Sequence, residues 1–172
     1  HHHGDHSGGN SAFLDAWKVA HAHAAPRIRA TAQARLEGAR ESLGELADRM
    51  ELEAAPSAAV ADVLATRDAV AALTADDFVP DQTFDTRIVV EMEDQAVEVT
   101  WVSPGHTDGD AFVYVPGENV LHCGDLFFNG RHPYVDDSAG ATPAGWIRCV
   151  DAMLGVCDGR TVVVPGHGEI TD

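Results

Sequence analysis

Four short motifs rich in histidine, aspartate and glycine constrain the fold of this chain more than any other feature of its sequence. The first motif, H-x-H-x-D-H, consists of His1, His3, Asp5 and His6. A loop with this spacing can direct two imidazoles to one cation, and a carboxylate with a third imidazole to another. The stub of a purification tag would explain three leading histidines but not the following segment GDHSGGN. We therefore interpret the motif as a metal-binding loop.

The other three motifs follow segments that have the composition of β-strands. His106 follows the predicted strand AVEVTWV, Asp125 follows NVLHC, and His167 follows TVVVP. Each is flanked by glycine, which lets the backbone turn sharply, so we expect the three side chains to reach one shared point. A single Gly-His pair is more often structural than metal-binding, but four such motifs in this order indicate one site.

The rest of the sequence predicts a mixed α/β fold. Residues 1–10 are typical of a polar loop, residues 11–20 of a short amphipathic helix, and residues 19–23 of a short strand. An Ala-rich stretch predicts a helix over residues 26–52 and a second one from Ser57 to about Leu73, which we interpret as helical packing or a lid. After it we expect two strands within residues 83–102, a hairpin over 111–124, an irregular loop over 129–143, a helix over 146–154 and a strand over 161–165.

The composition argues against several classes of protein and of partner. The chain has 172 residues and a formal net charge of −17, so like-charge repulsion argues against nucleic acid or an anionic membrane as the default partner and favours metal cations. Its 45% apolar content argues against disorder. The three cysteines include no CxxC pair, so neither a disulfide framework nor a thiolate zinc site is expected. No apolar run approaches the roughly 20 residues that a membrane span requires.

Taken together, the motifs resemble those of the metallo-β-lactamase-fold superfamily of metallohydrolases. HHHGDHSGGN resembles the first metal motif of that family, PGHTDGDAFVYVP the second, HCGDLFF the third and VVPGHG the last. The resemblance implies an α/β fold, a four-layer αββα sandwich forming a single domain over residues 1–172, with a helical segment at about 26–76. Family members usually have several strands before the first motif, so we expect a domain that lacks its N-terminal strands.

The resemblance also implies a set of metal ligands and a metal. It assigns His1, His3 and His106 to a first metal, Asp5, His6 and His167 to a second, and Asp125 to both. Because His3 stands where the di-iron branch has glutamate, zinc is favoured, with iron or manganese as alternatives. Because Asp125 stands where the best-known zinc β-lactamases have cysteine, the pattern is closer to thioesterase, lactonase and glyoxalase II-like members. The run GHTDGDAFVYVP to GDLFFNGRHPYVD most resembles bacterial zinc hydrolases of a quinoprotein-relay-like group.

The function that this resemblance implies is hydrolysis at a dinuclear zinc site. A metal-bridging hydroxide would cleave an ester-like bond (thioester, lactone, β-lactam or similar) of a small-molecule substrate, with Asp5 as the catalytic residue that orients it and relays its proton. Two alternatives stay open: an iron-dependent oxidoreductase of the same fold, such as a persulfide dioxygenase, and a non-catalytic accessory protein of a redox relay. The resemblance favours a periplasmic or secreted protein over a cytoplasmic one and leaves the oligomeric state open.

Several other polar residues compete for roles around the site. Arg131, His132 or Tyr134 contacts substrate, unless their loop merely closes the sandwich. Asp110 is the expected partner of a ligand histidine, because such histidines usually donate their second N–H to a carboxylate or carbonyl.

We assign no chemistry to the remaining candidates. His122 is expected in the core or beside the site, His2 to point away from the metals, and Cys123 to be a bystander in its strand. His21 and His23 are expected to be structural, and Asp136 and Asp137 to be solvated.

Overall fold

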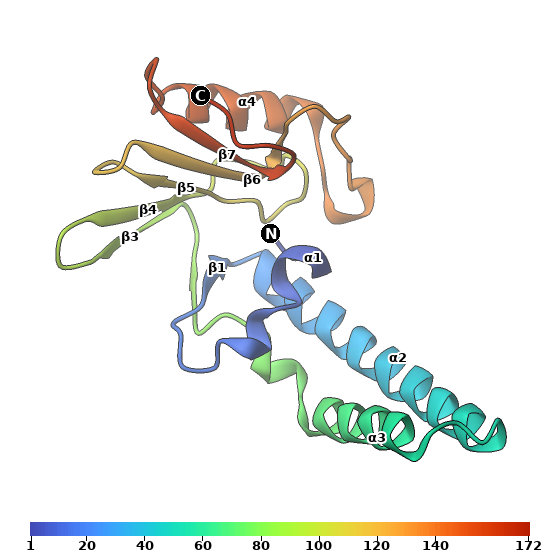
Figure 1. Ribbon diagram of the computed structural model, residues 1–172. Helices are drawn as coiled ribbons and strands as arrows, with labels where there is room; N and C mark the ends of the chain where they lie inside the picture. Colours follow the sequence, from blue (N-terminus) through green and yellow to red (C-terminus); the bar gives the residue numbers. More distant parts are fainter. The chain divides into compact units, whose positions relative to one another are not determined.

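The computed structural model describes residues 1–172 and divides into two compact units. The first, here called the sheet unit, consists of His1, Val19–Ala25 and Pro80–Asp172. The second, the helical unit, consists of His2–Lys18 and Pro26–Val79. Figure 1 shows the strands and helices of both units. None of the helices has both the length and the apolar character needed to cross a membrane.

A five-stranded sheet forms the body of the sheet unit (Figure 1). Its strands lie in the order β3 (Arg87–Glu91), β4 (Ala96–Thr100), β5 (Phe112–Val115), β6 (Val120–Phe128) and β7 (Val162–His167). Neighbouring strands from β3 to β6 are antiparallel, and β5 with β6 forms the predicted hairpin, whereas β6 and β7 are parallel. A parallel pair needs a crossover connection, and helix α4 (Pro143–Leu154) supplies it. Thr142 caps this helix by accepting a hydrogen bond from the Gly145 N–H at 3.1 Å.

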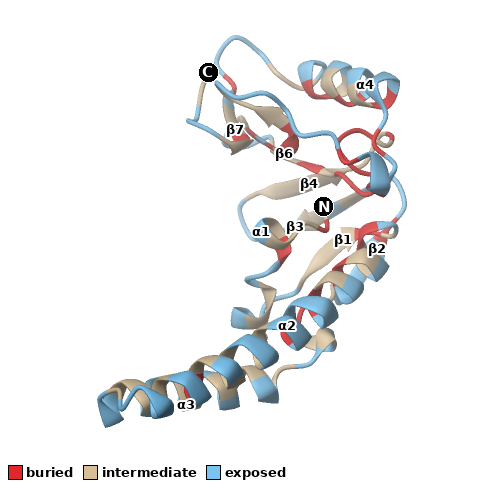
Figure 2. Cartoon of the chain, turned by 90° about the vertical axis from the view of Figure 1, so that its right-hand side faces the viewer, coloured by how far each residue is buried: buried red, intermediate tan, exposed pale blue.

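The core of the sheet unit lies between α4 and β6. Leu121, Cys123 and Leu126 of β6 pack with Cys149 and Met153 of α4 in one buried cluster. Burial raises the pKa of the Cys123 thiol to about 12, so this cysteine is a neutral core residue. The prediction that it is a bystander in its strand is therefore confirmed. Figure 2 shows buried residues gathered along β6 and the loops beside it.

A two-stranded parallel sheet also belongs to the sheet unit. The predicted strand at residues 19–23 is confirmed as β1 (Val19–His21), which pairs with β2 (Gln82–Phe84). The His21 ring stacks on Trp101 with centroids 4.6 Å apart, and its Nε2 donates to the Asp85 carbonyl at 2.9 Å. His23 lies edge-on to the same indole at 6.2 Å. Both histidines therefore pack as structural residues.

Two long helices dominate the helical unit, as the Ala-rich stretch predicts. They are α2 (Ala24–Leu52, whose first two residues fall in the sheet unit) and α3 (Ser57–Ala72). α2 buries Ile28, Ala32 and Leu36, which are spaced four residues apart and so share one face. Arg40 of α2 donates to the Leu73 carbonyl at 2.6 Å and so joins the two helices.

The beginning of the helical unit differs from the sequence prediction. The expected loop at residues 1–10 contains a helical turn, α1 (Gly4–Ser7), followed by a 3-10 turn, η1 (Asn10–Ala12). The predicted helix over residues 11–20 is wrong, because residues 13–18 form turns and irregular structure. Phe13 and Trp17 have helical spacing but are exposed, so no tertiary contact supports a helix too short to form on its own. A further 3-10 turn, η2 (Ala75–Asp77), closes the unit.

Candidate metal centre

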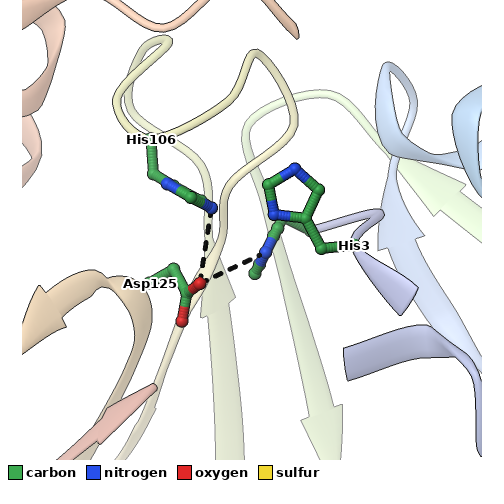
Figure 3. A group of neighbouring side chains, drawn as sticks. His3, His106 and Asp125 are labelled. Atoms are coloured by element: carbon green, nitrogen blue, oxygen red, sulfur yellow. Dashed lines mark ion pairs between the residues drawn. The ribbon is translucent and has the colours of Figure 1, made fainter. Parts of the chain in front are cut away.

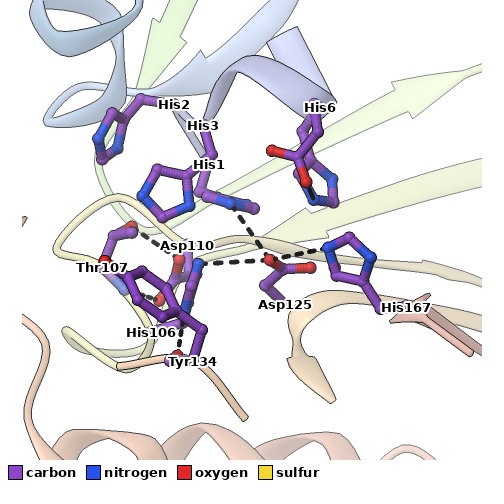
Figure 4. Close-up of polar contacts among 12 residues, drawn as sticks. His1, His2, His3, His6, His106, Thr107, Asp110, Asp125, Tyr134 and His167 are labelled. Carbon is purple, nitrogen blue, oxygen red and sulfur yellow. Dashed lines mark hydrogen bonds and ion pairs between the residues drawn. The ribbon is translucent and has the colours of Figure 1, made fainter. Parts of the chain in front are cut away.

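Three imidazoles of the sheet unit converge on one carboxylate (Figure 4). The Oδ2 atom of Asp125 lies 3.6 Å from His1 Nε2, 3.3 Å from His106 Nε2 and 3.5 Å from His167 Nε2. The side chains of His106 and Asp125 are almost fully buried, whereas that of His167 is 33% exposed. The group is therefore desolvated around Asp125 and open to solvent beside His167.

The spacing of these atoms fits ligands of a metal better than partners in hydrogen bonds. N–H···O hydrogen bonds have a donor–acceptor distance of about 2.7–3.2 Å, and all three distances exceed that range. Two donor atoms on one tetrahedral zinc, each about 2.1 Å from the ion, lie about 3.4 Å apart. The ligand atoms of His1, His106 and Asp125 also lie within 4.8 Å of one another. Imidazole nitrogen with carboxylate oxygen is a donor set that suits zinc.

Asp125 reaches this position through an irregularity in β6. The pairing of β6 with β7 changes register between His122 and Gly124 and again between Gly124 and Phe128. Such bulges re-aim a side chain without ending the strand, and Gly124 adopts a positive φ of 52° here. The prediction that Asp125 follows its strand is therefore wrong, because β6 continues to Phe128. His167 likewise is the last residue of β7 rather than a residue beyond it.

Gly166 makes room for the Asp125 carboxylate. A Cβ atom at Gly166 would collide with Asp125 Oδ1 and would lie 2.7 Å from the backbone carbon of Gly124. The sequence predicted a glycine that permits a turn, whereas the structure shows a glycine required by close approach. His167, the next residue, stacks its ring on Phe128 with centroids 5.3 Å apart.

A backbone carbonyl orients the His106 ring. His106 Nδ1 lies 2.7 Å from the carbonyl oxygen of Tyr134, and because a carbonyl only accepts, Nδ1 carries the proton. Nε2, which faces Asp125 in Figure 3, is then the nitrogen with a lone pair. A second hydrogen bond of this kind is what fixes the tautomer and direction of a metal-binding histidine.

Asp110 braces the loop that carries His106 instead of binding its ring. Its carboxylate accepts from the Thr107 N–H and from the Thr107 hydroxyl, both at 2.7 Å. Burial raises the pKa of Asp110, while the hydrogen bonds from Thr107 act in the opposite direction. The prediction that Asp110 is the partner of a ligand histidine is therefore wrong. Sequence reasoning missed the Tyr134 carbonyl because a backbone carbonyl has no residue-type signal.

The first motif is shared between the two units. His1 belongs to the sheet unit, whereas His3, Asp5 and His6 belong to the helical unit, where they form the N-cap and first turn of α1. Within that unit Asp5 Oδ2 and His6 Nε2 are 3.5 Å apart. The Ser7 hydroxyl bonds to the His3 carbonyl at 3.0 Å and so tightens the turn. That these three residues join the sheet-unit group in one site stays a prediction.

The loop after β6 bears the residues proposed to contact substrate. Arg131, His132 and Tyr134 are all exposed. Asp136 is not solvated as predicted: it is buried and accepts from the Ser138 hydroxyl at 2.6 Å and the Ala139 N–H at 3.1 Å, capping the 3-10 turn η3 (Asp137–Ala139). Asp137 is exposed, as expected.

His122 is also exposed, so its predicted place in the core is wrong. Its neighbours in β6, Leu121 and Cys123, take the inward positions of the strand.

Several known proteins resemble this chain in sequence or in structure. Residues 1–167 match the sequence profile of the Metallo-beta-lactamase superfamily. The metallo-beta-lactamase type 2 of Bacteroides fragilis is 23% identical over 91 residues, which cover 53% of this chain and 36% of that protein. The chain thus spans little more than a third of the curated relative it matches.

Solved structures give the corresponding likeness in three dimensions. The metallo-beta-lactamase from Pontibacter korlensis is 25% identical, with a TM-score of 0.47 over 73% of this chain and 56% of that one. The crystal structure of VMB-1 is 17% identical, with a TM-score of 0.58 over 100% of this chain and 59% of that one. The likeness to VMB-1 shows a shared fold, and the mixed helices and sheets of this chain are consistent with an αββα sandwich.

Proposed function

This chain belongs to the metallo-beta-lactamase superfamily of metal-dependent hydrolases, and we propose that it is a dinuclear zinc hydrolase that cleaves an ester-like bond in a small molecule. The bond is a thioester, lactone, β-lactam or similar. The observation that carries the proposal is the convergence of His1, His106 and His167 on the carboxylate of Asp125.

We assign His1, His3 and His106 to a first metal, Asp5, His6 and His167 to a second, and Asp125 to both. Two features support this assignment. Imidazoles from the first and last motifs lie at nearly equal distances from Asp125 Oδ2, which suits a carboxylate shared between two ions. His3, Asp5 and His6 follow His1 within five residues, so the covalent chain limits how far they can lie from it.

The residues of the chain have distinct tasks in this proposal. Asp125 and Asp5 offset part of the charge of two divalent cations, and the Tyr134 carbonyl keeps His106 Nε2 directed at the site. The Asp5 carboxylate, whose side chain is 59% exposed, orients the attacking water and takes up its proton. When bound, the metal ions would supply a water of lowered pKa and a Lewis acid for the substrate oxygen.

The loop after β6 is the proposed place of substrate contacts. Arg131, His132 and Tyr134 expose their side chains on this loop, while the carbonyl of Tyr134 holds the buried His106. The N–H of Asn129 at its start also donates to the His167 carbonyl at 2.9 Å, so the loop is held beside the site and presents exposed side chains there. We propose that these three residues contact the substrate and influence KM more than kcat.

The proposal is tested by reconstituting metal-depleted protein with Zn²⁺, Fe²⁺ or Mn²⁺ and assaying thioesters, lactones and β-lactams. The zinc-loaded protein is expected to hydrolyse at least one class. Asp125→Ala is expected to lower kcat/KM by at least about 100-fold and to reduce bound zinc, because it removes the shared ligand. Asp151→Ala removes an exposed carboxylate of α4 in the same unit and is expected to preserve both.

Three outcomes would contradict the proposal. Oxygen consumption by the iron form without hydrolysis would indicate an oxidoreductase. Full metal binding without turnover of any compound would indicate an accessory protein. Equal activity in Asp125→Ala and the wild type would remove the metal centre from the mechanism.

A further inference from the structure

The helical unit contains a cavity that the proposed hydrolysis does not use. It has a volume of about 240 Å³ and lies among α1, the first half of α2 and the end of α3. Its wall combines the polar side chains of Ser11, Thr31 and Arg35 with the apolar side chains of Leu36 and Phe78. This volume is slightly below the roughly 300 Å³ at which drug-sized ligand pockets begin, so it suits a smaller molecule.

Arg35 is held against the glycine face of α1. Its Nη1 atom stands where the side chain of Gly4 would begin, and its Cζ lies 2.7 Å from that Cβ position. The same Nη1 is 3.5 Å from the Cβ position of Gly8. Gly4 and Gly8 are four residues apart and therefore lie on one side of α1. The absence of both side chains leaves room for the guanidinium beside this turn, while Arg35 as a whole stays exposed to solvent.

The guanidinium of Arg35 forms no ion pair and no hydrogen bond within the chain. Other arginines do pair with carboxylates: Arg29 with Asp76, and Arg87 with Glu98. A chain with 28 acidic residues offers many partners, yet none reaches this guanidinium. A guanidinium presents five N–H donors in a fork that matches a carboxylate, so Arg35 is a positioned donor at the wall of the cavity.

Two of the three hydroxyl groups that line the cavity add donors to the same wall. Ser11 and Thr31, like Arg35, make no side-chain hydrogen bond within the chain, so their hydroxyl groups remain available to an occupant. The hydroxyl of Ser7, which also lines the cavity, is already bonded to backbone carbonyls, and Leu36, Val70 and Leu73 offer apolar contact. A cation with two hydroxyl donors, set beside an apolar surface, is complementary to an organic acid rather than to an inorganic anion.

We propose that this cavity binds a small organic carboxylate with an apolar body. The carboxylate bonds to Arg35 and to the hydroxyls of Ser11 and Thr31, and the apolar body packs against Leu36, Val70, Leu73 and Phe78. Because the cavity is also lined by Gly4 of α1 and by its C-cap Gly8, an occupant stabilises that turn. The site requires no metal ion and does not depend on the proposed hydrolase activity.

The test uses hexanoate as the probe and hexanamide as its uncharged counterpart, titrated calorimetrically into protein kept metal-free with EDTA. Chelation prevents the carboxylate from binding through a metal. Hexanoate is expected to bind saturably and at least about tenfold more tightly than hexanamide, because only the acid forms charge-assisted bonds. Arg35→Gln is expected to weaken hexanoate binding at least about tenfold for the same reason.

Two further variants separate the cavity from general charge effects. Arg49→Gln removes an exposed arginine of the same helix that does not line the cavity, and it is expected to leave the affinity unchanged. Ala39→Leu adds volume to the wall and is expected to weaken binding as strongly as Arg35→Gln. Equal affinity for hexanamide, equal weakening by Arg49→Gln, or no saturable binding to the folded wild-type protein would each overturn the proposal.

Discussion

The sheet unit and the helical unit use their side chains in different ways. In the sheet unit, α4 and β6 bury a continuous cluster that includes Leu121 and Cys149, each 1% exposed. In the helical unit, α3 buries none of its residues, although it is a regular helix from Ser57 to Ala72 (Figure 2). Tertiary packing therefore positions the sheet and its side chains, whereas α3 depends mainly on local helix propensity.

The two units also differ in how many hydrogen bonds join their segments. The loop that carries His106 is joined to other segments by backbone hydrogen bonds, from Asp108 N–H to the Ala139 carbonyl at 2.8 Å and from Thr142 N–H to the Gly105 carbonyl at 3.1 Å. Between the long helices of the other unit, by comparison, the Arg40 guanidinium bonds only to carbonyls near the end of α3. The donor atoms that the sheet unit contributes are therefore expected to keep a more fixed arrangement.

The largest difference between the units is expected in how much free energy of unfolding each loses when a leucine is replaced by alanine. Leu121→Ala should lower the free energy of unfolding of the sheet unit by about 3 kcal/mol, because the side chain is fully buried. Leu64→Ala on the half-buried α3 should cost about 1 kcal/mol or less. Denaturant unfolding followed by hydrogen exchange in each unit measures both values. Equal costs would show that α3 is packed as tightly as β6.

Gly166→Ala is expected to have the next largest effect. The new methyl group collides with the Asp125 carboxylate, so the sheet unit should lose about 2 kcal/mol of stability, and zinc should bind at least about tenfold more weakly. Gly159→Ala is the matched control, because no atom lies within 4 Å of the Cβ position there. If both variants bound zinc as the wild type does, close approach at Gly166 would not matter to the site.

A smaller loss of stability is expected when the hydrogen bonds between Thr107 and Asp110, in the loop that carries His106, are weakened. Thr107→Val removes the hydroxyl that bonds to Asp110 and accepts from the Gly109 N–H at 3.2 Å. It should cost about 1–2 kcal/mol in thermal or chemical unfolding, because buried polar partners lose their bonds. Thr66→Val on the exposed face of α3 should cost less than about 0.5 kcal/mol. A reversed order would contradict the contrast between the units.

The smallest predicted effect is a pH dependence in the sheet unit. Burial against Trp101 lowers the pKa of His21 below its usual value of 6.5, so the unfolded chain takes up a proton here more readily than the folded one. This contribution to stability is complete above about pH 6.5 and decreases as the pH falls below that value. Between pH 7.5 and 5.5, His21→Gln should therefore lose less stability in urea than the wild type, whereas a larger loss would contradict this account.

Patterns within the sequence predicted much of the fold, because they reflect local physics. The three long helices and the strands β3 to β7 were predicted in type from periodicity, capping residues and turn residues, although α4 begins three residues earlier and β6 and β7 end later than predicted. The failed helix at residues 11–20 shows the limit of this reasoning, since Phe13 and Trp17 have the right spacing but no surface to pack against.

The candidate site was predicted in its residue types more fully than in its geometry. His106, Asp125 and His167 meet as expected, because their motifs are short and chemically specific. The bulges in β6 and the Tyr134 carbonyl could not be predicted, since both arise from contacts between distant segments. The burial of Asp136 is a similar case, because its partners form a turn that only the folded loop creates.

The central claim is that the imidazoles around Asp125 belong to a dinuclear metal centre, and metal stoichiometry tests it most directly. The protein is reconstituted with zinc, dialysed to remove excess metal and analysed by inductively coupled plasma mass spectrometry. It should retain about two zinc ions per chain. His167→Ala should retain about one, and Asp151→Ala, which changes an exposed residue of α4, about two. A wild-type protein that retains no zinc, or a His167→Ala variant that retains as much as the wild type, would contradict the account.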